Sequence, residues 1–127
     1  MREKIRDRER LKHMLECIDV LTEARSRLSL ETIQADRIIY HGLVKEIEII
    51  GEAAYMLTLE FKESHPEVPW KEIIDMRHVL VHGYYKINPA QLWHTLQHDI
   101  EELRPFIKKY IAETTPDETA ISKNSTP

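Results

Sequence analysis

Apolar side chains recur at intervals of three or four residues along most of this sequence, an interval typical of amphipathic helices. The pattern predicts a first helix over residues 5–27 and a long, strongly apolar helix over residues 35–62. The prolines of segment 64–69 end that helix, because proline cannot continue the backbone hydrogen-bond ladder. A third helix is expected over residues 70–83 and a fourth over residues 88–111, where Asn88-Pro89 supplies a cap and a first-turn proline.

Single residues refine these boundaries. Ser29 is placed to cap a short helical segment through Ile33, ahead of the long helix. Gly51 lies inside the apolar stripe of the long helix, where glycine costs about 1 kcal/mol relative to alanine. It therefore marks either the close approach of another helix or an incidental substitution. Pro105 predicts a kink in the last helix.

The composition favours a single all-α domain. The 127 residues are 42% hydrophobic and 31% charged, with 3 glycines and 6 prolines, which suits long amphipathic helices better than a turn-rich β fold. The helical domain is expected to span residues 1–112. Residues 113–127 are too polar to offset the entropy of ordering them, and they are predicted to form a disordered tail.

Charge and cysteine content narrow the classes of function. The formal net charge is −4 and the pI is about 6.0, which argues against coating nucleic acid through a broad basic face. Basic residues at positions 2–12 alternate with acidic ones and are interpreted as a solvated, ion-paired helix face rather than a phosphate-binding patch. The sequence has a single cysteine and no leader-like start, which predicts a cytoplasmic protein. Its apolar runs are too short to cross a bilayer, so no membrane span is expected.

The residues with the most distinctive chemistry lie at positions 77–84, which read Arg-His-Val-Leu-Val-His-Gly-Tyr. Arg77 and His82 are five positions apart, so on a regular helix their side chains point about 140° apart. They can act together if the helix ends at His82-Gly83, if the arginine folds back, or if two subunits share one site.

An arginine paired with a histidine suits phosphodiester cleavage without a metal ion. Guanidinium matches phosphate oxygens, and imidazole gives or takes a proton near neutral pH. In RNA the 2′-hydroxyl attacks the adjacent phosphorus, with His82 as general base or acid and Arg77 stabilising the phosphate charge, while Tyr84 orients either group. The structural alternative is that Arg77 pairs with a carboxylate, His82 supports the helix end and Tyr84 packs in the core.

Three stretches resemble the HepT-like HEPN family. Residues 69–84 are similar to its pattern R-x-x-x-x-H-x-Y behind a P-W-x-x-I-x-x-M lead, residues 49–54 to its I-I-G-E-A-A helix, and residues 7–15 to its opening. The resemblance runs from about residue 7 to residue 106, nearly the whole predicted helical domain.

The resemblance implies an antiparallel bundle of four to five helices that dimerises through the bundle. It also implies a metal-independent endoribonuclease toxin of a type VII-like toxin–antitoxin system, acting on RNA without a cofactor, with Arg77 and His82 in the family's catalytic positions. The implied partner is a minimal nucleotidyltransferase antitoxin (MntA-like) that adenylylates the motif tyrosine, here Tyr84. A bulky anionic AMP at that position fills and repels the RNA path.

Two residues depart from the family pattern. His78 stands where asparagine is common, and it is a candidate auxiliary residue that adds a second imidazole to the cleft. Asp75 stands where a glycine-like residue is frequent, and it is a candidate partner for Arg77 or His78, a pairing that weakens phosphate binding.

The histidines also have the spacing of a metal site, but this interpretation is disfavoured. His94 and His98 together with His78 and His82 make a four-imidazole set, yet no cysteine or carboxylate is spaced to complete it, and no metal is expected.

The remaining candidates are structural. Trp70 and Trp93 are interpreted as core anchors, and Cys17 as a buried thiol rather than a nucleophile. The competing hypothesis for function is a non-catalytic helical module that binds a nucleotidyltransferase or a nucleotide.

Overall fold

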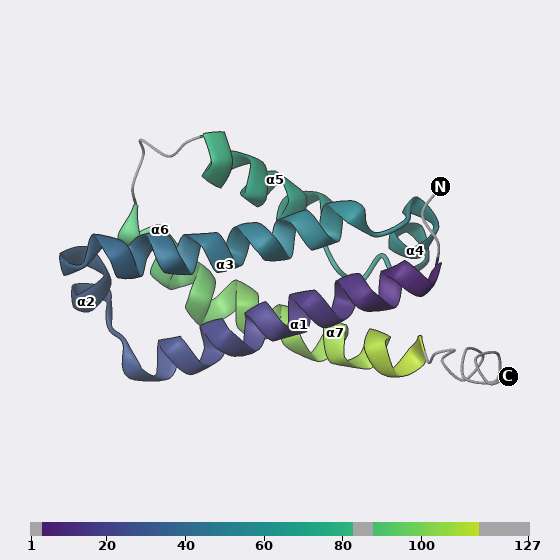
Figure 1. The fold of residues 1–127 in the computed structure, drawn as a ribbon, viewed down its shortest axis with the longest axis horizontal. Helices are drawn as coiled ribbons and strands as arrows, with labels where there is room; N and C mark the ends of the chain where they lie inside the picture. Colours follow the sequence, from purple (N-terminus) through teal and green to yellow (C-terminus); the bar gives the residue numbers. More distant parts are fainter. Residues whose placement is uncertain (1–3, 83–87, 115–127) are drawn as a thin grey trace, which may run out of the picture.

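A computed structural model describes residues 4–82 and 88–114 (Figure 1). The helices are α1 Lys4–Arg27, α2 Leu30–Ala35, α3 Arg37–Met56, α4 Leu59–Ser64, α5 Trp70–His82, α6 Pro89–His94, the π-helical turn η1 Thr95–Asp99, and α7 Ile100–Glu113. The described residues contain no strand, and the all-α prediction is confirmed. None of the helices in this part of the chain combines the length and apolar character that crossing a bilayer requires.

The long helices alternate in direction around one core (Figure 1). Helices α1 and α3 lie side by side and antiparallel, α5 packs against α3, and the rod formed by α6, η1 and α7 packs against α1. The start of α1 and the end of α7 meet at one end of the bundle, where Arg8 Nε donates a hydrogen bond to the Thr114 carbonyl oxygen at 3.1 Å. The arrangement is the antiparallel helical bundle that the family resemblance implies.

The core is built from apolar side chains that recur along the long helices. Each long helix buries one stripe with spacings of three or four residues, so each contributes a continuous apolar face. The buried stripes include Leu11, Met14, Ile18 and Leu21 of α1, Leu43, Ile47, Ile50 and Ala54 of α3, and Ile100, Leu103, Ile107 and Tyr110 of α7.

The single long helix predicted over residues 35–62 is wrong, because the structure divides this stretch into the end of α2, all of α3, and α4. Asp36 begins α3 by accepting hydrogen bonds from two backbone N–H groups of the next turn at 3.0 and 3.2 Å. Thr58 begins α4 through a hydroxyl that accepts a hydrogen bond from the Phe61 N–H at 3.1 Å. Apolar periodicity continues across both capping residues, so it does not reveal the breaks.

A buried carboxylate of α1 fixes the second of these breaks. Asp7 is 2% exposed, and its two oxygens accept hydrogen bonds from the Thr58 backbone N–H at 2.8 Å and from the Thr58 hydroxyl at 2.7 Å. Burying a carboxylate is costly unless such hydrogen bonds compensate it. The pair therefore ties the start of α1 to the junction between α3 and α4.

Two predicted helix caps are confirmed. Ser29 caps α2 by accepting a hydrogen bond from the Thr32 N–H at 3.2 Å, and Asn88 caps α6 by accepting one from the Gln91 N–H at 3.0 Å. The fourth predicted helix is one rod, but the wide π turn η1 interrupts its α-helical geometry before α7.

Pro105 lies within α7, and the kink expected there stays a prediction. The predicted domain boundary at residue 112 falls in the last turn of α7, which ends at Glu113. The predicted tail beyond Thr114 lies outside the described residues.

Candidate functional site

Helix α5 carries the candidate catalytic residues, and its start is anchored in the core. Trp70 is buried, and its indole Nε1 donates a hydrogen bond to the His65 carbonyl oxygen at 2.8 Å. The helix is described from Trp70 to His82, and residues 83–87 lie outside the described residues, so the helix end expected at His82-Gly83 stays a prediction. The His82 side chain and all of Tyr84 lie outside the described residues, and their convergence with Arg77 stays a prediction.

Arg77 is directed toward α3. Its Nη2 lies 2.8 Å from Oε1 of Glu52, and the two side chains are 32% and 52% exposed. The Tyr55 ring, on the same face of α3, has its centroid 6.0 Å from the Arg77 Cζ. A carboxylate partner for Arg77 is expected from the sequence, with Asp75 as the named candidate, but the sequence does not identify Glu52 or Tyr55.

Gly51 allows the backbones of α3 and α5 to approach closely at Arg77. A Cβ atom at position 51 would overlap the Cβ of Arg77, and it would lie 3.1 Å from the Arg77 Cγ and 3.2 Å from the Ile73 carbonyl oxygen. The close-approach interpretation of this glycine is confirmed. Gly51, Glu52 and Tyr55 together form the part of α3 against which Arg77 lies, and we call these three residues the arginine seat.

Of the two candidate partners of Asp75, Arg77 is paired with another carboxylate, and the pairing of Asp75 with His78 stays a prediction. Asp75 Oδ2 lies 2.8 Å from Nζ of Lys71, whereas Arg77 is bound to Glu52. Residues two positions apart on a helix do not face each other, but residues four apart do. Asp75 therefore pairs with Lys71 on the same face of α5, and the Arg77 guanidinium pairs with Glu52 of α3. His78 is exposed on α5.

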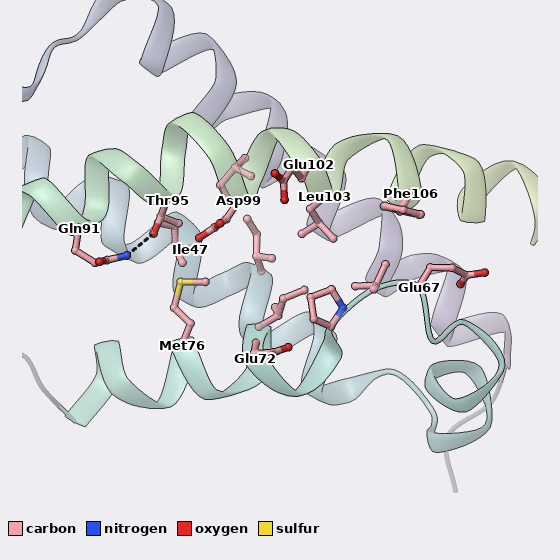
Figure 2. A pocket seen from close by; sticks show the side chains of 15 residues that line it. Ile47, Glu67, Glu72, Met76, Gln91, Thr95, Asp99, Glu102, Leu103 and Phe106 are labelled. Carbon is pink, nitrogen blue, oxygen red and sulfur yellow. Dashed lines mark hydrogen bonds between the residues drawn. The ribbon is translucent and has the colours of Figure 1, made fainter.

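A groove of about 520 Å³ runs along the other flank of α5, between α5 and the η1–α7 rod (Figure 2). Its floor is apolar, and four carboxylates line it from both sides: Glu67, Glu72, Asp99 and Glu102. The described lining residues include no lysine, arginine or histidine, and Arg77 is not among them. Such a groove repels an anionic ligand.

The remaining candidates from the sequence are a cysteine, two histidines and a tryptophan outside α5. The Cys17 side chain is buried, and burial together with the nearby Glu46 carboxylate raises the pKa of its thiol to about 12, which opposes a role as a nucleophile. The His94 and His98 rings lie 4.5 Å apart. No group of three or more histidine, cysteine or carboxylate side chains within residues 4–82 and 88–114 is arranged to hold a metal ion. Trp93 is partly buried against the core.

The chain is similar to known proteins along most of its helical domain. The family model described as ribonuclease HepT-like matches residues 14–110. A protein of Caldanaerobacter subterraneus named "Putative RNase" is 38% identical over 101 residues, which cover 80% of this chain and 90% of that protein. A protein of Thermococcus cleftensis named "Probable ribonuclease HepT" is 32% identical over 99 residues, which cover 78% of this chain and 90% of that protein. No solved structure gave a significant match.

Proposed function

Because the chain belongs to the ribonuclease HepT-like family, we propose that it is a metal-independent endoribonuclease in which Arg77 and His82 carry out the reaction. The observation that carries this proposal is the position of Arg77. Its guanidinium is partly exposed and held by Glu52, and His82 follows five residues later on α5. A cation held by an ion pair therefore precedes an imidazole by five positions in the chain.

The reaction proceeds by attack of the RNA 2′-hydroxyl on the adjacent phosphorus. The O2′–P bond forms, the P–O5′ bond breaks, and the proton of the 2′-hydroxyl is taken up while the leaving O5′ receives one. His82 moves a proton in this exchange as general base or acid. Arg77 stabilises the negative charge that builds on the non-bridging phosphate oxygens.

Glu52 orients the guanidinium for this role. A guanidinium has five N–H donors, so an ion pair through Nη2 leaves donors for a phosphate. Since the planar group is fixed on one side by the carboxylate, its other side is pre-oriented before RNA binds.

The active form is a homodimer in which two copies of the 77–84 segment form a shared cleft. The angle of about 140° between Arg77 and His82 on a regular helix supports this, because the arginine of one subunit can then serve the histidine of the other. A wild-type protein that sediments as a monomer while cleaving RNA at full rate would contradict the shared cleft.

The ribonuclease acts as a cytoplasmic toxin that an MntA-like minimal nucleotidyltransferase neutralises by adenylylating Tyr84. The support is the family membership together with the position of Tyr84 two residues beyond His82. Co-expression with such an antitoxin should add one or more AMP masses to the peptide that contains Tyr84, with loss of RNA cleavage. An unmodified Tyr84 in an inhibited protein would exclude this control mechanism.

The test of the activity is RNA cleavage by the purified protein in excess chelator. The proposal is supported if the wild-type protein cleaves RNA in excess chelator and the Arg77→Ala and His82→Ala variants do not. RNA left intact by the wild-type protein, together with weaker binding of a nucleotidyltransferase by the same variants, would favour a non-catalytic binding module instead.

Removing the charge of Glu52 should slow cleavage with little effect on stability. We expect Glu52→Gln to lower the single-turnover rate by about ten- to a hundredfold, because a loosely held guanidinium no longer meets the phosphate in its reactive geometry. The free energy of unfolding should change by less than about 1 kcal/mol, since the pair is half exposed.

The chain offers a matched control for this variant. Arg104 Nε lies 2.9 Å from Oδ1 of Asp19, and these side chains are 35% and 49% exposed, close to the values of the Arg77–Glu52 pair. Asp19→Asn should leave the cleavage rate unchanged. If both variants cleave at the wild-type rate, Glu52 does not position Arg77 for the reaction.

A further inference from the structure

Tyr55 is the exposed aromatic residue of the arginine seat. It lies three residues beyond Glu52 on α3 and is 50% exposed. Two cations lie over its ring, with the Arg77 Cζ 6.0 Å and the Lys62 Nζ 5.9 Å from the ring centroid. Half of the residue nevertheless remains accessible to water.

Lys62 is held in place beside this ring. Its Nζ donates a hydrogen bond to the Tyr55 carbonyl oxygen at 3.3 Å, across the junction between α3 and α4. This hydrogen bond places the ammonium close to the aromatic ring of the same residue. Arg77 is fixed on its side by Glu52 at 2.8 Å.

Electrostatics also favours this side of α5 for an anionic chain. The groove on the other flank is lined by carboxylates of Glu67, Glu72, Asp99 and Glu102 and by no cation among the described residues (Figure 2). A polyanion is repelled there, whereas the face with Tyr55 carries two cations, Arg77 and Lys62, beside the Glu52 carboxylate.

We propose that Tyr55 is a nucleobase-binding subsite, on which one unpaired base of the RNA stacks while Arg77 and Lys62 bind neighbouring phosphates. The inference rests on the proposed ribonuclease function and adds a substrate class to it. Single-stranded nucleic acid is bound by aromatic platforms with flanking cations, and such stacking tolerates any base. A base inside a duplex has no free face for the ring, so the subsite selects single-stranded segments with little sequence preference.

Binding of a non-cleavable RNA tests this subsite apart from the reaction. The probe is a short fluorescein-labelled, fully 2′-O-methylated single strand, whose affinity is measured by fluorescence anisotropy. Tyr55→Leu should raise its Kd about tenfold, because an aliphatic side chain does not replace the base–aromatic stack. Tyr55→Phe should bind like the wild-type protein. Leu59→Ala is the matched control, since Leu59 is 65% exposed on neighbouring α4, and it should not change the Kd.

A set of probes with one abasic nucleotide at successive positions identifies the stacked base. At one position the missing base should weaken binding to the wild-type protein about tenfold, and at that position it should have no effect on Tyr55→Leu, which lacks the same stack. Equal losses in both proteins at every position would overturn the subsite. So would a Tyr55→Leu variant that binds normally but cleaves slowly, because the ring would then only support Arg77.

The outcomes separate this inference from the ribonuclease proposal. A wild-type protein that shows the Tyr55-dependent abasic effect but leaves unmodified RNA intact would remove the ribonuclease proposal and retain the subsite. Cleavage of RNA without any Tyr55-dependent binding would overturn the subsite and support the ribonuclease proposal. A wild-type protein that does not bind the probe would overturn the subsite.

Discussion

The Arg77→Ala variant is expected to cleave RNA about two to three orders of magnitude more slowly than the wild-type protein. The substitution removes the cation that stabilises charge on the non-bridging phosphate oxygens. Because the side chain is only 32% exposed, the substitution also removes surface packed against α3, and an arginine of similar exposure is needed as a control. His82→Ala should cause a loss of similar size, because proton transfer by a positioned imidazole contributes on that scale. The measurement is the single-turnover cleavage rate in excess chelator, with thermal unfolding recorded for each variant.

Arg104→Ala is the control for this experiment. It removes an arginine of similar exposure from an ion pair of similar length, at the contact between α7 and α1 rather than on α5. Its cleavage rate should equal that of the wild-type protein. A comparable loss in Arg104→Ala would assign the Arg77 effect to general destabilisation, and an unchanged rate in Arg77→Ala would remove Arg77 from the reaction.

Gly51→Ala is expected to destabilise the protein, although alanine forms helices better than glycine. The added methyl group overlaps the Arg77 Cβ and approaches the Ile73 carbonyl oxygen to 3.2 Å, so α3 and α5 must separate. Such overpacking costs about 1–3 kcal/mol, more than the gain of about 1 kcal/mol from helix propensity. Cleavage should fall as well, because Arg77 is displaced from Glu52.

Gly42→Ala, on the same helix, is expected to stabilise the protein instead. A Cβ at position 42 meets nothing within 4 Å, so this variant should be more stable than the wild-type protein by about 1 kcal/mol. Both changes are measured by chemical denaturation. If the two variants were stabilised alike, the close contact between α3 and α5 at Gly51 would be excluded.

Much of the fold could be predicted from the sequence because it depends on periodicity. The expected first helix agrees with α1, and the expected third helix agrees with α5 to within one residue. Periodicity failed over residues 35–62, where the apolar stripe runs through two helix ends. Those ends depend on single polar side chains, Asp36 and Thr58, and on a partner far away in the sequence, Asp7.

The candidate site could be predicted in its chemistry but not in its contacts. Arg77 was identified from the residues of α5, whereas its partners Glu52 and Tyr55 come from α3, and no local pattern connects the two helices. A signal was nevertheless present, because Gly51 interrupts the apolar stripe next to Glu52. The glycine marks a point where another helix approaches closely, and the adjacent carboxylate indicates that a basic side chain of that helix lies there. Asp75 does not pair with Arg77 for a local reason, since Lys71 lies four positions away on the same helix face, whereas Arg77 lies only two positions away.

The backbone amide of Thr58 donates a hydrogen bond to Asp7, so its exchange rate reports on the docking of α1. In most helices a slow amide exchange rate reports the opening of that helix, whereas the Thr58 N–H donates to a carboxylate of α1 at 2.8 Å. Its hydrogen–deuterium exchange therefore measures how often the first turns of α1 leave the bundle. The same contact implies that a chain shortened past residue 7 loses order not only at its N-terminus but also at the junction between α3 and α4, close to Tyr55 and Lys62.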